Sequence, residues 1–210
     1  MIFFRRHLTS CRIVGFFNMT LGNILVGKVA CLTALGMFDR ANQLLHLPVH
    51  QFSAPLGNVA IPALSSLQSA PERFRSYFRY AVFFIGLIAF PFVLMLAVFA
   101  NEVVLIILGP QWVEVTPIFL LLVPASLVRI IQVALKWVYI TLGRTDRQFR
   151  WGIVDFVCNF LFLAIGIQFG VLGVAFAFTV KALFLIVPET LYCTRGTIVK
   201  LSDLFQPLIY

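Results

Sequence analysis

Charged residues are scarce in this sequence of 210 residues: Asp, Glu, Lys and Arg together make up 11% of it. A soluble domain usually carries about 25% charged residues. Hydrophobic residues make up 61% of the chain, and the mean hydropathy is +0.99. This composition excludes an ordinary soluble domain and indicates an integral membrane protein.

Cysteines and catalytic motifs are also sparse. The four cysteines, Cys11, Cys31, Cys158 and Cys193, show no C-x-x-C spacing and lie in or beside apolar segments, which argues against disulfides and a metal site. The sequence has no glycine-rich phosphate loop, nucleophile elbow or pair of catalytic carboxylates. We therefore expect neither an enzyme nor a bound cofactor. The amino end, MIFFRRHLTSCR, lacks a small-residue cleavage site, so we do not expect a cleaved signal peptide.

Long apolar segments follow one another along the whole chain. A membrane-spanning helix needs about 20 mostly apolar residues. Six segments fit, at residues 13–35, 41–67, 80–100, 115–142, 151–169 and 171–193. The tight turn Gln168-Phe169-Gly170 joins the last two. The sequence predicts an all-α fold, a polytopic membrane helical bundle of six transmembrane helices, as a single domain over 1–210.

The basic residues alternate between the loops. Of the 16 Lys and Arg residues, 11 lie before the first span or after the second, fourth and sixth, whereas the remaining loops hold only Arg40. Cytoplasmic loops of membrane proteins carry an excess of Lys and Arg. The pattern predicts six spans with both termini in the cytoplasm. The net charge of +8 is therefore a topology signal, and we expect no nucleic-acid partner.

The second span contains three prolines at intervals of seven, Pro48, Pro55 and Pro62. Seven helical steps return a side chain to nearly the same face, so the prolines form one stripe. Each proline leaves a backbone carbonyl without its helical partner, which costs several kcal/mol in lipid. This stripe must face protein, water or a polar side chain, and we expect the helix to kink there.

The opposite face of the same helix is polar. It carries Gln43, His46, His50, Ser53 and Gly57. We expect a bendable helix that lines a wet cavity; the alternative is a helix packed among others, with its polar groups satisfied by neighbours. His46 and His50 have the spacing of a metal pair, but no carboxylate accompanies them and H-E-x-x-H is absent, so hydrogen bonding is expected rather than metal binding.

Four basic residues lie within the predicted spans: Lys28, Arg129, Lys136 and Lys181. Such residues are costly in a bilayer and usually face a bundle interior or an aqueous cavity. Helical spacing places Arg129, Gln132 and Lys136 on one face. Lys181 is too deep to reach the cytoplasm easily, whereas Lys28 lies toward the outer half, where extension of its side chain to the surface is an alternative.

Acidic residues are fewer within the spans. Asp155 has about the depth of Lys136, and we expect these two to pair, while Glu189 is expected at the cytoplasmic rim. The interior charge is then mainly positive, which suits an anionic ligand such as a phosphate or diphosphate. The alternative is that each base pairs with a carbonyl or with a neighbouring acid.

Several stretches carry a family resemblance. They are GMFDRANQLLHLPVHQFSAPLGNVAIPALSSLQSAPERFRSYFRYAV at 36–82, ILGPQWVEVTPIFLLL at 107–122 and LGRTDRQFRWGIV at 142–154. Their order and content resemble bacterial polysaccharide flippases of the Wzx/WzxC type, in the multidrug/oligosaccharidyl-lipid/polysaccharide exporter superfamily. The resemblance covers nearly the whole chain.

The resemblance implies one lobe of a two-lobe transporter, similar to the carboxy-terminal half. A lipid-linked anionic oligosaccharide or polysaccharide is then the expected substrate, moved by alternating access across the bacterial inner membrane. Membrane lipids and an amino-terminal lobe or a partner membrane subunit are the other expected partners. In one departure, Gly22 stands where the family often has an acidic residue.

On this hypothesis the basic and polar residues of the spans form the substrate site. Arg129, Lys136 and Lys181 attract the anionic head group, with Gln132 on the same face. Gln43, His46, His50 and Asn58 contact sugar or water, and the amphipathic stretch PERFRSYFRY at 71–80 anchors at the cytoplasmic surface. Two alternatives stay open: a drug or cation exporter of the same superfamily, and a non-transporting membrane subunit or truncated remnant.

Overall fold

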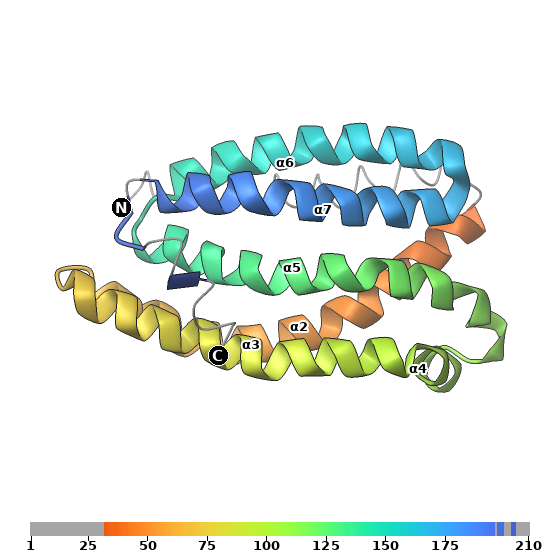
Figure 1. Ribbon diagram of the computed structural model, residues 1–210, viewed down its shortest axis with the longest axis horizontal. Coiled ribbons are helices and arrows are strands. Elements are labelled where there is room, and N and C mark those ends of the chain that lie inside the picture. Colours follow the sequence, from red (N-terminus) through yellow and green to blue (C-terminus); the bar gives the residue numbers. More distant parts are fainter. Residues whose placement is uncertain (1–31, 196, 200–202, 205–210) are drawn as a thin grey trace.

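The computed structural model describes residues 32–195, 197–199 and 203–204, and these residues form helices connected by short turns, without a strand (Figure 1). The elements are α2 (Leu32–Ser66), α3 (Pro71–Val98), α4 (Ala100–Ile107), η1 (Pro110–Val115), α5 (Thr116–Thr141), α6 (Thr145–Gly166), η2 (Ile167–Phe169) and α7 (Gly170–Thr194). The predicted first span, 13–35, lies almost entirely outside the described residues.

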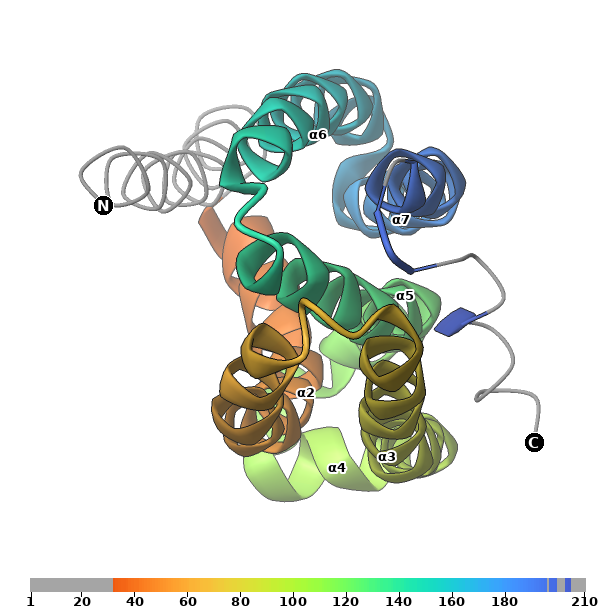
Figure 2. The same cartoon turned by 90° about the vertical axis from the view of Figure 1, so that its left-hand side faces the viewer.

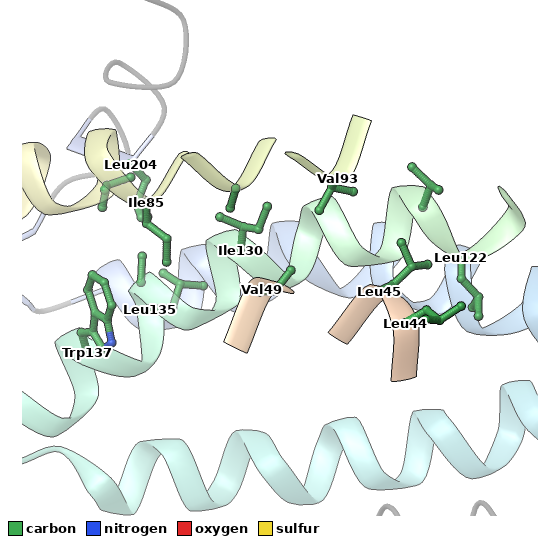
Figure 3. Close-up of a cluster of buried hydrophobic side chains, with 14 of the residues drawn as sticks. Leu44, Leu45, Val49, Ile85, Val93, Leu122, Ile130, Leu135, Trp137 and Leu204 are labelled. Atoms are coloured by element: carbon green, nitrogen blue, oxygen red, sulfur yellow. The ribbon is translucent and has the colours of Figure 1, made fainter. Parts of the chain in front are cut away.

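Helix α5 is the centre of the bundle. Looking along the helices, Figure 2 shows α5 between α2 and α3 on one side and α6 and α7 on the other. The buried side chains of α5 include Phe119, Leu122, Ile130 and Leu135, none more than 2% exposed. Figure 3 shows how they meet side chains of α2 and α3 such as Leu45 and Ile85. A helix that is apolar nearly all round in this way is typical of an interior position.

Three stretches of the described chain are long and apolar enough to cross a membrane: Pro71–Val98, Pro110–Thr141 and Thr145–Thr194. The third contains both α6 and α7, which run side by side in opposite directions (Figure 1). Helix α2 is not among them. The count of six spans therefore stays a prediction.

The α6–α7 hairpin is closed by small residues. The chain reverses at η2 and Gly170, whose φ of +73° is a left-handed conformation that glycine adopts without strain. A Cβ atom on Gly166 would lie 2.8 Å from the Gly173 carbonyl oxygen and 2.9 Å from the Ala177 Cβ. Only a residue without a side chain permits this approach of the two helices. The hairpin holds the polar faces of α6 and α7 together.

Helix α2 runs unbroken from Leu32 to Ser66 through all three prolines. Pro55 and Pro62 are exposed, and Pro48 is half-buried. On the other face, Ser53 and Gly57 are buried, and a Cβ on Gly57 would lie 3.1 Å from Nε1 of Trp137 on α5. This part of the polar face therefore packs on α5, and the expectation that it lines a cavity is wrong for these two residues.

The stretch 71–80 is the beginning of α3, not a separate surface segment. Pro71 occupies the first turn, where a missing N–H costs nothing. Phe74 and Phe78 are fully buried, while Arg73 and Tyr80 are exposed. The aromatic side of this amphipathic stretch thus faces the bundle core.

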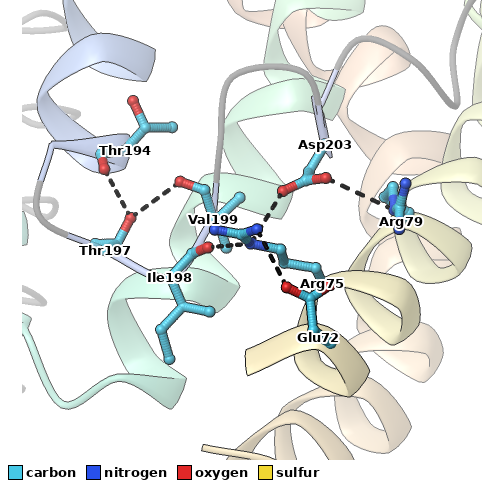
Figure 4. A network of polar contacts seen from close by, with 8 residues as sticks. All are labelled: Glu72, Arg75, Arg79, Thr194, Thr197, Ile198, Val199 and Asp203. Carbon is cyan, nitrogen blue, oxygen red and sulfur yellow. Dashed lines mark hydrogen bonds and ion pairs between the residues drawn. The ribbon is translucent and has the colours of Figure 1, made fainter. Parts of the chain in front are cut away.

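Arginines at the beginnings of α3 and α6 and after α7 lie at one end of the bundle, which we call the arginine-rich end. Here the segment after α7 crosses back to α3 (Figure 4). Arg75 Nε donates a hydrogen bond of 2.6 Å to the Ile198 carbonyl oxygen. The buried carboxylate of Asp203 lies 3.8 Å from Arg75 Nε and 3.6 Å from Arg79 Nε. These contacts tie the beginning of α3 to the chain beyond α7.

Candidate functional site

The α6–α7 interface holds a buried lysine with polar partners from the facing helix. Lys181 is 7% exposed, and its Nζ lies 3.0 Å from Oδ1 of Asp155 and 3.2 Å from Oδ1 of Asn159. Asp155 and Asn159 are four residues apart on α6, so both project from one face toward Lys181. A buried ammonium group requires such partners, because burial without them costs several kcal/mol.

A buried carboxylate lies further along α7. Glu189 is 8% exposed, and its Oε2 accepts a hydrogen bond of 2.8 Å from Nε2 of Gln132 on α5. Glu189 lies near the end of α7, and α7 packs closely on α5 at this level, so its carboxylate is buried within the protein. Gln132 therefore faces an acid of the same chain. We call Lys181, Asp155, Asn159, Gln132 and Glu189 the interior cluster.

Arg129 lies at the margin of this cluster. Its side chain is half-buried on α5, and its Cζ is 6.0 Å from the centre of the Phe178 ring on α7. Lys181 Nζ is 5.3 Å from the same ring. Among the ion pairs formed by the residues that the structure describes, none includes Arg129. Its guanidinium is thus held by an aromatic face, a weaker partner than a carboxylate.

Two histidines of α2 belong to the same region. The rings of His46 and His50 stack with centroids 6.1 Å apart, and Arg129 is near enough to act electrostatically on His46. His46 is half-buried and His50 exposed. Gln43, also exposed, accepts a hydrogen bond of 3.4 Å from Arg40. Arg129 and His46 thus lie close together, and His50 stacks on His46.

Two of the predicted site residues lie apart from this group. Asn58 is exposed on the second half of α2, and Lys136 is exposed on α5. Among the residues that the structure describes, Asp155 forms an ion pair with Lys181 and none with Lys136. The predicted Lys136–Asp155 pair is therefore wrong, because the α6 face that carries Asp155 is turned toward α7.

Sequence reasoning did not identify Asn159 and Phe178 as parts of the site. The spacing of Asp155 and Asn159 on one helix face was a usable signal, and so was the position of Phe178 one turn before Lys181. Within residues 32–195, 197–199 and 203–204, no group of three or more His, Cys, Asp or Glu side chains could hold a metal ion.

Comparison with known proteins identifies the family. The family model described as "Polysaccharide biosynthesis protein" matches residues 1–117, more than half of the chain. The chain belongs to this polysaccharide biosynthesis protein family. Together with the apolar helices, this makes it a membrane protein of polysaccharide biosynthesis.

Curated relatives of this family member carry corresponding names. The lipopolysaccharide biosynthesis protein WzxC of Escherichia coli is 24% identical over 195 residues, which are 88% of this chain and 39% of WzxC. The teichuronic acid biosynthesis protein TuaB of Bacillus subtilis is 24% identical over 142 residues, 68% of this chain and 29% of TuaB. The amylovoran biosynthesis protein AmsL of Erwinia amylovora is 24% identical over 142 residues, 68% of this chain and 37% of AmsL. No solved structure matches.

The chain spans about two fifths or less of the length of these relatives. The resemblance to Wzx-type polysaccharide flippases is confirmed at the level of the family.

Proposed function

We propose that this chain is one lobe of a polysaccharide flippase that moves an anionic lipid-linked oligosaccharide across the bacterial inner membrane by alternating access. Both termini are then cytoplasmic, and a second lobe or partner membrane subunit completes the transporter. Family membership and the names of the relatives support a role in polysaccharide export.

The observation that carries the proposal is the environment of Arg129. A guanidinium in the apolar part of a bundle normally has a carboxylate partner. No described carboxylate pairs with Arg129, which instead lies beside the Phe178 ring and near His46. Arginine binds phosphate and diphosphate oxygens through paired N–H groups. Arg129 therefore has unused capacity for an anionic head group.

Other polar residues and the prolines of α2 have further roles in the proposed transport. Exposed Gln43 and His50 and half-buried His46 have donors and acceptors suited to sugar hydroxyls. Lys181 contributes positive charge near the Phe178 ring, although Asp155 compensates most of it. Gln132 holds Glu189 in place. Lys136 and Asn58 stay candidates only for contacts with the second lobe or with substrate bound against it, since both are exposed on this lobe. The prolines of α2 supply the bend that opens and closes the cavity.

Export measurements on arginine variants test the proposal. The gene is deleted in its own host and returned with its upstream coding region, as wild type, Arg129→Gln, Arg129→Lys or Arg73→Gln. We expect Arg129→Gln to lower surface polysaccharide at least about tenfold at equal protein abundance, since a charge-assisted pair contributes roughly 1.5–3 kcal/mol. Arg129→Lys keeps the charge and should retain part of the export. Arg73 is exposed in the first turn of α3 and serves as the control. Full export by Arg129→Gln would remove the proposed role.

One observation favours a second candidate, a cation or drug exporter. The interior cluster contains two carboxylates, Asp155 and Glu189, against one lysine, so its charge is less positive than the sequence predicts. A cationic substrate would need these carboxylates. Resistance to cationic drugs that is lost in Glu189→Gln but kept in Arg129→Gln would favour this candidate. If the chain supports neither polysaccharide export nor drug resistance, with or without the upstream region, the result would favour a non-transporting subunit or remnant.

A further inference from the structure

A groove of about 770 Å³ lies at the arginine-rich end, and its lining residue Trp151 also contacts Glu189 of the interior cluster. It is bounded by the beginnings of α3 and α6, by the end of α7 and by the segment that follows. Arg75 and Arg195 supply its charged walls, Trp151 and Tyr192 its aromatic walls, and Pro188 and Leu191 part of its apolar lining. The groove thus has a charged side and an apolar side.

Tyr192 links the aromatic and cationic parts of this groove. Its ring stacks with that of Trp151 at a centroid distance of 5.8 Å. The Cζ atom of Arg147 is 5.9 Å from the centre of the same ring, and Arg147 also donates a hydrogen bond to the Arg195 carbonyl oxygen. Trp and Tyr with nearby arginines are typical of the level at which a helix leaves the bilayer. A groove with this lining suits lipid head-group depth.

The charge around the groove is unbalanced. The described arginine-rich end carries seven arginines, Arg73, Arg75, Arg79, Arg144, Arg147, Arg150 and Arg195, and three carboxylates, Glu72, Asp146 and Asp203. Two of the carboxylates, Glu72 and Asp203, pair with Arg75 and Arg79. No ion pair between described residues involves Arg147 or Arg195. The groove therefore has positive charge available for an anion.

An apolar path leads away from the groove along α7. Leu191, Val187 and Phe184 follow at helical spacing, and they are 52%, 60% and 66% exposed. Such a stripe matches a hydrocarbon chain that lies along the helix, while the phosphate of the same molecule reaches the arginines. A free inorganic anion would use only the charged half of this surface.

We propose that this groove binds the phosphate head group of an anionic membrane phospholipid. The phosphate ligands are Arg195, which lines the groove, and Arg147, which lies over the ring of the lining residue Tyr192. The lipid chains follow the exposed stripe of α7. This site does not depend on the proposed transport, since it binds lipid of the membrane in which the chain resides. An arginine that contacts the bound phosphate contributes about fivefold in affinity, and Arg73 and Arg144 do not line the groove.

Native mass spectrometry of the purified full chain in detergent tests this proposal. The probes are phosphatidylglycerol, phosphatidylcholine and a polyprenyl diphosphate, and the variants are Arg147→Gln/Arg195→Gln and, as a matched control, Arg73→Gln/Arg144→Gln. We expect wild type to prefer phosphatidylglycerol to phosphatidylcholine, and the first variant to bind phosphatidylglycerol about 10- to 30-fold more weakly. The control should stay within about threefold of wild type. Equal binding of the two phospholipids, or unchanged binding by Arg147→Gln/Arg195→Gln, overturns the site. A tenfold preference for the polyprenyl diphosphate over phosphatidylglycerol overturns the assignment of the occupant.

A second measurement locates the lipid without an arginine variant. Brominated phosphatidylglycerol quenches tryptophan fluorescence on contact, and Trp151 lines the groove. Brominated phosphatidylglycerol should quench the fluorescence of wild type more strongly than brominated phosphatidylcholine does. This difference between the two lipids should disappear in Trp151→Phe. An excess that persists in Trp151→Phe places the lipid elsewhere and overturns the proposal.

Discussion

Lys181 Nζ on α7 and Asp155 Oδ1 on α6 are 3.0 Å apart within the α6–α7 hairpin. The side chains are 9% and 28% exposed, so this pair is mostly withdrawn from solvent. It decides how much positive charge the interior can present, because an ammonium that is paired with a carboxylate attracts an additional anion weakly. Arg129, beside the same Phe178 ring, becomes the stronger candidate for substrate binding.

A double-mutant cycle on Lys181→Met and Asp155→Asn tests this pair. We expect Asp155→Asn alone to destabilise the purified protein by about 2 kcal/mol, since it leaves a buried ammonium with a weaker partner. The combined variant should show a coupling of at least about 1 kcal/mol in thermal unfolding. Lys136→Met combined with Asp155→Asn is the control, and its effects should add. Additive effects in the first cycle and coupling in the second would restore the Lys136–Asp155 pair.

Substitution of Gly166 tests the close approach of α6 and α7. In Gly166→Ala the new Cβ meets the Gly173 carbonyl oxygen at 2.8 Å, so the helices must separate. Overpacking of this kind costs about 1–3 kcal/mol. Gly36→Ala on α2 is the matched control, because a Cβ there meets no atom of the described residues within 4 Å and alanine favours a helix by up to about 1 kcal/mol. In thermal unfolding followed by circular dichroism, we expect a lower melting temperature for Gly166→Ala and no decrease for Gly36→Ala. Equal shifts in the two variants would argue against close packing.

The sequence predicted the presence of the helices better than the residues at which they begin and end. The ranges 115–142 and 171–193 nearly coincide with α5 and α7 because each is bounded by turns and charged residues. The range 80–100 was predicted as a membrane span, whereas the helix α3 starts earlier, at Pro71, with charged turns. Hydropathy marks the part of a helix that prefers lipid, whereas the backbone hydrogen bonds continue into the polar ends.

The sequence predicted which residues belong to the candidate site better than it predicted their contacts with one another. Helical spacing predicted Arg129, Gln132 and Lys136 on one face of α5; Arg129 and Gln132 contact α7, whereas Lys136 is exposed. This spacing carried no information about how α6 and α7 are rotated against each other. The partner of Asp155 and the burial of Glu189 depend on that rotation. The small residues Gly166 and Gly173 set the helix separation, and their role becomes visible only when the facing helix is known.

The contact between Asp203 and α3 predicts a local effect on the segment after α7. Asp203 is 5% exposed and faces Arg75 and Arg79, so Asp203→Asn removes the charge that holds this segment (Figure 4). We expect the Thr197 amide, which donates to the Thr194 carbonyl, to exchange its hydrogen about tenfold faster. Glu72→Gln serves as the control, because Glu72 is 88% exposed in its contact with Arg75. Protection that is unchanged in Asp203→Asn would show that the ion pairs do not fix the segment.

Glu189 and Gln132 form the last testable pair. A buried carboxylate without a described ion-pair partner is costly, and Gln has nearly the same shape and can accept the same hydrogen bond. We therefore expect Glu189→Gln to unfold at the same or a higher temperature than wild type. Gln132→Leu should destabilise wild type by about 1.5–3 kcal/mol, because it leaves the buried acid with only its hydrogen bond to Trp151. The same change in the Glu189→Gln background should cost about 1 kcal/mol less. A strong loss of stability in Glu189→Gln would mean instead that the negative charge itself stabilises the cluster with Lys181.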